Sequence, residues 1–168
     1  MTEIKQHLVH WLRDAYAMEK QSIEMLEKQA HHIQNYPELK QRITTHLEET
    51  KNQLGRLEKC LEILDENPSA FKAGMGKLAG SLQAIGGMFA ADEIVKSAMS
   101  GYVFEHFEIG NYRILIAGAK TAGESEIARL CRTSLEEEEA MAKWLEEHLD
   151  GVTEQFLMQE QADKKARA

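Results

Sequence analysis

Apolar residues recur at steps of three and four positions along most of the chain, the spacing that places side chains on one face of an α-helix. The first of these stripes starts at Ile4, with Thr2 as a plausible N-cap before it. Pro37, Pro68 and Gly123 separate the stripes, and such residues commonly begin or end helices. The pattern predicts four long helices, over about residues 2–35, 37–66, 88–120 and 125–150.

The segment between the second and third predicted helices differs from the rest of the chain. It spans residues 67–87 and contains five glycines, each of which disfavours a helix by about 1 kcal/mol relative to alanine. We interpret it as a long connection with one short helix near residues 77–84. Gly151 is expected to end the fourth helix, and residues 152–168 are expected to form a frayed, solvated tail.

The order of these elements indicates a particular kind of helical bundle. Short connections make the helices of each pair antiparallel neighbours, and the long link allows a crossover between the pairs. A simple up-down bundle with a slack loop would show a similar pattern of lengths. We predict one all-α domain over residues 1–168, a ferritin-like four-helix bundle with one long crossover connection.

The composition excludes several classes of partner. The net charge of −8 argues against binding to nucleic acid or to anionic membranes, because both attract basic surfaces. No run of about 18 apolar residues is present, so no segment is expected to span a membrane. Cys60 and Cys131 form no metal or redox motif, and the start of the chain does not resemble a signal peptide. We therefore expect a cytoplasmic protein with ordinary thiols.

Acidic residues lie on or beside the apolar stripe near the middle of every predicted helix. Their depth is similar, so an antiparallel bundle could bring them together. Unpaired carboxylates are not stable in a core; they take up protons, form ion pairs or bind metal. The stripes near them hold imidazole and amide groups rather than Lys or Arg. Four carboxylates would balance two divalent cations, and oxygen with nitrogen ligands suits iron or manganese. The four candidates are Glu19, Glu49, Glu105 and Glu138.

Two observations weigh against this interpretation. A single Glu is usually exposed, and the run containing Glu137 and Glu138 is typical of a solvated face. Di-iron bundles usually contain Glu-x-x-His twice, whereas this chain has none. It offers instead the reversed order His46-x-x-Glu49, and Glu-x-x-Glu on the third helix, which adds Glu108. Any site would therefore be rich in carboxylate and poor in imidazole.

Four segments of the chain resemble the helix signatures of the YciE/YciF family of bacterial stress proteins. They are "DAYAMEKQ", "HLEETKNQL", "FEHFEIGNY" and "SLEEEEAM". The resemblance covers nearly the whole chain and implies a ferritin-like, rubrerythrin-related, cytoplasmic protein that forms a homodimer and has a di-metal site. The metal ligands that it implies are Glu19, Glu49, Glu105, Glu108 and Glu138, with His46 as a further candidate and Glu137 competing with Glu138.

Two functional hypotheses follow. In the first, two divalent ions, iron or manganese, react with a small oxidant such as peroxide or dioxygen during stress. Glu105 and either Glu49 or Glu138 would bridge the ions, Glu19 and Glu108 would be terminal ligands, and Tyr112 would be a redox-active or hydrogen-bonding phenol. In the second, the protein is a non-enzymatic helical dimer or scaffold with a vestigial metal site.

Overall fold

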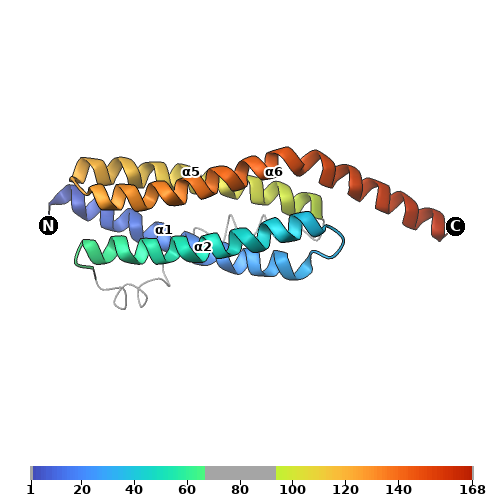
Figure 1. Ribbon diagram of the computed structural model, residues 1–168, viewed down its shortest axis with the longest axis horizontal. Helices are drawn as coiled ribbons and strands as arrows, with labels where there is room; N and C mark the ends of the chain where they lie inside the picture. Colours follow the sequence, from blue (N-terminus) through green and yellow to red (C-terminus); the bar gives the residue numbers. More distant parts are fainter. Residues whose placement is uncertain (1, 67–93, 168) are drawn as a thin grey trace.

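Four long helices make up the described part of the chain, and the all-α bundle predicted from the sequence is confirmed (Figure 1). The computed structural model describes residues 2–66 and 94–167. The predicted connection at 67–87, its short helix and the first residues of the third helix lie outside the described residues. The helices are α1 (Glu3–His32), α2 (Pro37–Ile63), α5 (Ile94–Ala122) and α6 (Ser125–Ala166).

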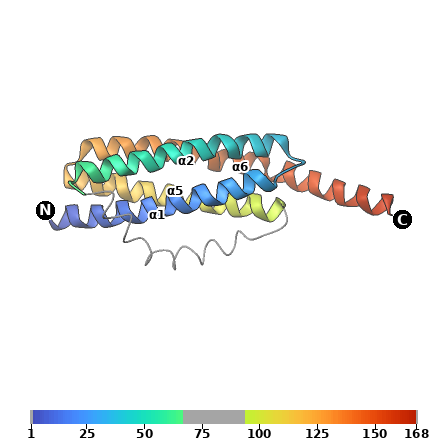
Figure 2. The same cartoon turned by 90° about the horizontal axis from the view of Figure 1, so that it is seen from below.

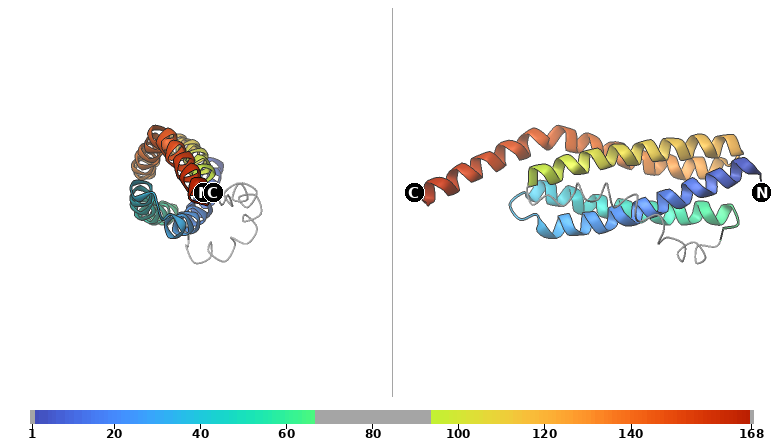
Figure 3. Two further views of the ribbon diagram at one scale, coloured as in Figure 1. Left: turned by 90° about the vertical axis from the view of Figure 1, so that its right-hand side faces the viewer. Right: turned by 180° about the vertical axis from the view of Figure 1, so that it is seen from behind.

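The arrangement of the helices matches the ferritin-like order. The closest packing is between α5 and α6 and between α1 and α2, and α1 also packs on α5 and α2 on α6. The end-on view shows the four helices around a common axis (Figure 3). The end of α2 and the start of α5 lie at opposite ends of the bundle (Figure 2). The link between the two pairs is therefore a crossover, as the length of the connection predicted.

Local signals set most of the helix boundaries. The Thr2 side chain accepts a hydrogen bond from the backbone N–H of Lys5 at 3.4 Å, the expected N-cap of α1. Pro37 occupies the first turn of α2, where its missing N–H has no intrahelical partner to lose. Gly123 separates α5 from α6 with a φ of 78°, a left-handed conformation that favours glycine.

The predicted end of the fourth helix is wrong. α6 continues through Gly151 to Ala166 and projects beyond the bundle (Figures 1 and 3). One glycine disfavours a helix by about 1 kcal/mol, which flanking contacts offset. Val152 is buried, and Gln155 donates a hydrogen bond to the backbone carbonyl of Asn35 at 2.9 Å. The predicted tail is exposed as expected, but it is helical.

The interior has two apolar clusters and a group of buried polar residues. One cluster contains Leu8, Leu12 and Leu115, and the other contains Leu26 and Leu145. On α1 and α2 the buried polar residues lie between the two clusters, near the middle of each helix. No helix among the described residues is long and apolar enough to cross a membrane.

Candidate metal centre

The buried polar group contains acidic residues from three helices and a histidine from the fourth. Glu19 lies on α1, His46 on α2, Glu105 and Glu108 on α5, and Glu138 on α6; each is at most 1% exposed. Glutamate is almost never fully buried unless it is paired. Four such residues at one level of the bundle indicate a site rather than chance burial.

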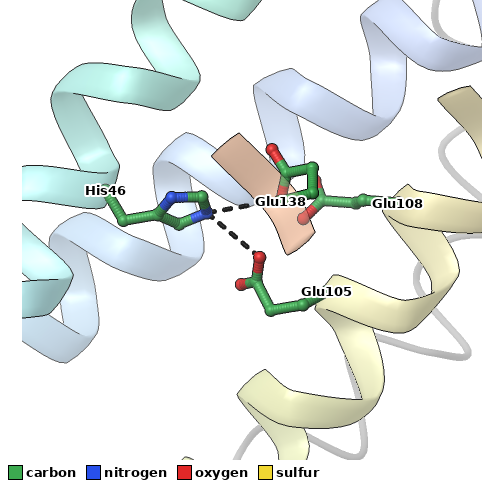
Figure 4. A group of neighbouring side chains, drawn as sticks. All are labelled: His46, Glu105, Glu108 and Glu138. Atoms are coloured by element: carbon green, nitrogen blue, oxygen red, sulfur yellow. Dashed lines mark ion pairs between the residues drawn. The ribbon is translucent and has the colours of Figure 1, made fainter. Parts of the chain in front are cut away.

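Four of these side chains converge closely (Figure 4). One ligand atom from each of His46, Glu105, Glu108 and Glu138 lies within 4.8 Å of the others. His46 Nε2 is 3.1 Å from Glu105 Oε2 and 3.5 Å from Glu138 Oε2. Neither contact is a hydrogen bond: His46 Nε2 and both carboxylate oxygens lack a hydrogen-bond partner. The two carboxylates and the imidazole therefore point at a common space.

Glu19 is tied to Tyr112 rather than included in this group of four. The buried Tyr112 hydroxyl donates a hydrogen bond to Glu19 Oε1 at 2.5 Å, and Glu19 Oε2 has no hydrogen-bond partner. Tyr112 thus fixes one oxygen of Glu19 and leaves the other available. The sequence placed both residues near the site. It offered no signal for this contact, because the two residues lie 93 positions apart on different helices.

Glu49 lies on the far side of His46 from the other carboxylates. Its Oε2 is 2.8 Å from His46 Nδ1 and 3.0 Å from Arg42 Nη1, and its side chain is 28% exposed. Partial burial would raise the pKa of Glu49, but the contacts with His46 and Arg42 outweigh it and lower that pKa. An ionised Glu49 accepts a hydrogen bond from the Nδ1–H of His46, so Nε2 is the ring nitrogen that faces Glu105 and Glu138.

The expectation that no Lys or Arg lies near the candidate glutamates is therefore wrong. Arg42 was missed because it lies seven residues before Glu49. Seven residues are about two helical turns, so Arg42 and Glu49 lie on the same face of α2. This spacing was the signal in the sequence that could have predicted the contact. Arg56 similarly binds both oxygens of Glu137, at distances from 2.6 to 3.2 Å, and Gln53 donates to Glu137 at 3.0 Å.

The structure also separates Glu137 from Glu138. Glu137 is half-buried and points to Arg56, whereas Glu138 is fully buried and faces His46. Adjacent helical residues differ by about 100° around the axis, so only one of the two can point into the bundle. Of the two alternatives left open by the sequence, Glu138 is the one that points into the cluster.

The donor atoms that remain unpartnered test whether this set suits a metal. Among the described residues, the buried oxygens without a hydrogen-bond partner include both of Glu108, both of Glu138, Glu19 Oε2 and Glu105 Oε2, and His46 Nε2 joins them. Such atoms cost roughly 1–3 kcal/mol each, and more when charged. Six carboxylate oxygens and one imidazole nitrogen form the donor set that iron and manganese bind in proteins. The residues present could hold a divalent metal ion.

Electrostatics adds to the same conclusion. Burial raises the pKa of Glu108 and Glu19 well above the usual range, and the nearby Glu138 carboxylate adds to both effects. Burial also raises the pKa of Glu105 to about 8. Burial would lower the pKa of His46, but the facing Glu105 carboxylate raises it well above its usual value. Without a cation, the cluster must hold protons to limit repulsion between its carboxylates.

Comparisons with known proteins support the family resemblance. The family described as "Domain of unknown function (DUF892)" matches residues 3–158. Protein YciF of Escherichia coli (strain K12) is 29% identical over 151 residues, which cover 83% of this chain and 86% of YciF. These matches support the YciE/YciF resemblance at the level of the family and do not single out YciE within it.

Solved structures show the same fold. A crystal structure of a protein from Xanthomonas campestris pv. campestris has a TM-score of 0.79 and 39% identity, and the match covers 95% of this chain and 99% of that chain. The crystal structure of the E. coli stress protein YciF has a TM-score of 0.71 and 25% identity, and the match covers 92% of this chain and 99% of that chain.

Proposed function

The chain belongs to the DUF892 family, and we propose that it is a di-metal carboxylate protein of the stress response. One relative, YciF, is described as a stress protein. The observation that carries the proposal is the set of buried donor atoms without a hydrogen-bond partner on Glu19, His46, Glu105, Glu108 and Glu138. If the metal function had been lost, we would expect apolar residues at these positions. Well-packed apolar side chains often stabilise a core at least as much as buried ionic groups do.

The ligand assignment follows from the positions of the side chains. Glu105 and Glu138, which both face His46, would hold two divalent ions, iron or manganese, together with Glu19 and Glu108. His46 Nε2 would supply a nitrogen ligand. Four ionised carboxylates would balance the charge of two divalent ions. The four proposed from the structure include Glu108 in place of Glu49, which was among the four candidates from the sequence.

The remaining residues of the site position these ligands. Glu49, held by Arg42, accepts a hydrogen bond from His46 Nδ1 and so sets which nitrogen faces the cluster. The Tyr112 hydroxyl fixes Glu19 and holds a proton next to the site, where it is the candidate redox-active phenol. Bound iron or manganese would supply the redox chemistry for reaction with peroxide or dioxygen.

Anaerobic titration with ferrous ion tests the proposal, with an expected stoichiometry of about two per chain. Glu138→Gln keeps the shape of a buried ligand and removes its charge, so it should weaken binding. Glu136→Gln is the matched control, because Glu136 is exposed on the same helix two residues away. Far-UV circular dichroism checks that both variants fold. Equal ferrous binding by the two variants would reject the site.

A second candidate function is a helical homodimer that acts as a scaffold. An exposed apolar stripe on α5 favours it: Met99, Val103, Phe107 and Ile114 are 50%, 49%, 40% and 54% exposed. Large apolar stripes on a surface often mark protein–protein contacts. The homodimer is compatible with either function, and sedimentation at several protein concentrations tests it. Elemental analysis of protein purified without chelator separates the two functions, because the scaffold requires no bound metal.

A further inference from the structure

Gln53 is a fully buried polar residue on α2 that the ligand set proposed above does not include. It follows His46 by seven residues, about two helical turns, so both side chains lie on the same face of α2. Its Nε2 donates a hydrogen bond to Glu137 at 3.0 Å, whereas its Oε1 is buried and has no hydrogen-bond partner among the described residues. A buried acceptor without a partner is destabilising, so this oxygen requires an explanation.

The contact with Glu137 fixes the orientation of the amide. The guanidinium of Arg56 binds both oxygens of Glu137, at distances from 2.6 to 3.2 Å. A guanidinium has only donors, so Glu137 acts as an acceptor in this pair. It therefore takes the amide nitrogen of Gln53 as its partner, and the amide oxygen faces away from it.

The side chain of Gln53 also adjoins the cluster. Burial would raise the pKa of Glu138, but contacts with its neighbours, chiefly His46 and also Gln53, lower it. In the part of the chain that the structure describes, both oxygens of Glu138 lack a hydrogen-bond partner, as Oε1 of Gln53 does. A cation bound to Glu138 would therefore lie close to the amide.

The contacts of Gln53 repeat those of His46, the nitrogen ligand proposed above. His46 donates from Nδ1 to a glutamate that an arginine holds, Glu49 with Arg42, and its Nε2 has no hydrogen-bond partner in the described structure. Gln53 donates from Nε2 to its own arginine-bound glutamate and keeps Oε1 in the equivalent state. Hydrogen bonds of this kind orient a metal ligand and increase its basicity.

We propose that Gln53 is a further metal ligand of the cluster, bound through Oε1 and oriented by Glu137 and Arg56. The inference rests on the proposed function, because the cation is the one that the cluster binds. A carbonyl oxygen suits manganese and similar ions. It is also neutral, so it adds a ligand without changing the charge balance between four carboxylates and two divalent ions.

Three variants separate a ligand from a packed amide. Gln53→Leu removes the amide and keeps a side chain of similar size. Gln53→His restores a ligand, because one ring nitrogen can donate to Glu137 while the other binds metal. Thr50→Val is the matched control: Thr50 is fully buried one turn away on the same face, but its hydroxyl donates to the backbone carbonyl of His46 at 2.9 Å.

Manganese titration followed by electron paramagnetic resonance, which counts the unbound ion, tests the proposal. The native chain and Thr50→Val should bind about two ions per chain with equal affinity. Gln53→Leu should bind at least one of them about tenfold more weakly or worse, and Gln53→His should recover most of that loss. Native affinity in Gln53→Leu would overturn the inference and leave the proposed function standing. A native chain that binds no manganese would reject the proposed function, and the ligand with it.

Urea denaturation of chelator-treated protein distinguishes a ligand from a structural amide. As a ligand, Gln53 contributes nothing to the metal-free fold through Oε1, so Gln53→Leu should keep or raise the denaturation midpoint. A structural amide would instead make the midpoint fall. If Gln53→Leu lowers both the midpoint and the manganese affinity, Gln53→His decides: recovered affinity supports the ligand, and affinity as weak as that of Gln53→Leu overturns it.

Discussion

Replacing Glu105 by glutamine should stabilise the metal-free protein and weaken the metal-bound one. The glutamine has nearly the same shape but no charge, so it removes the penalty of a carboxylate that is 1% exposed and surrounded by other acids. A residue kept for stability would show the opposite behaviour. The two opposite effects of one substitution therefore distinguish a binding site from a structural ion pair.

The size of the effect follows from proton linkage. Burial raises the pKa of Glu105 from the ordinary 4.5 of an exposed glutamate, which applies to the unfolded chain, to about 8 in the folded state. Between these values the folded state holds more protons than the unfolded state, so the free energy of unfolding falls as pH rises. At pH 7 the difference of about 2.5 pH units corresponds to roughly 3 kcal/mol at 1.36 kcal/mol per unit. This is an upper bound, because His46 loses a partner when Glu105 becomes neutral.

Urea denaturation of chelator-treated protein, followed by circular dichroism between pH 5 and pH 8, measures this effect. The advantage of Glu105→Gln over the native chain should be small at pH 5 and grow toward pH 8. With manganese at about 1,000 times its Kd the order should reverse at pH 7, because the native chain then gains about 4.1 kcal/mol, more than the variant's advantage of roughly 3 kcal/mol. Exposed Glu136→Gln should show neither trend. A variant less stable than the native metal-free chain at pH 8 would refute the reasoning.

Three further outcomes are expected. Glu49→Ala should weaken manganese binding about 10- to 100-fold in a competition assay with a chelating dye. Glu49→Gln still accepts a hydrogen bond from His46 and should retain most of the manganese affinity. Equal losses in the two variants would make Glu49 a ligand. Tyr112→Phe leaves a buried carboxylate oxygen unpartnered and should lower the free energy of unfolding by about 1–3 kcal/mol in urea, and no change would contradict the hydrogen bond to Glu19. Gly151→Ala should raise the free energy of unfolding by up to about 1 kcal/mol, because α6 is helical at this residue. Gly123→Ala should lower it, because the backbone there has a positive φ. A change of the same sign in both variants would contradict the described end of α6.

The sequence by itself determined the fold class and most members of the cluster. The repeat of apolar residues near 3.6 positions is a local property, so it predicted four helices, and the length of the link between the pairs predicted the crossover. Whether a residue is buried likewise depends on its angular position around its own helix, which the sequence spacing gives. Glu19, Glu105 and Glu108 lie on such stripes and are buried, with Glu138.

Local rules failed where neighbouring elements decide the outcome. Gly151 looked like a helix end, but contacts between α6 and the turn after α1 sustain the helix beyond it. Glu49 and Glu137 lie at the edges of their stripes, where a small rotation moves a side chain from core to surface. Arg42 and Arg56 hold them outside the cluster.

The tertiary structure alone decided which atoms meet. The Tyr112–Glu19 hydrogen bond, the approach of His46 to Glu105 and the hydrogen bond from Gln53 to Glu137 all depend on the rotation and register of one helix against another. Helical periodicity fixes the direction of each side chain around its own axis, but it contains no information on how far one helix is shifted along its neighbour. Packing of the two apolar clusters sets that shift, and with it the geometry of the site.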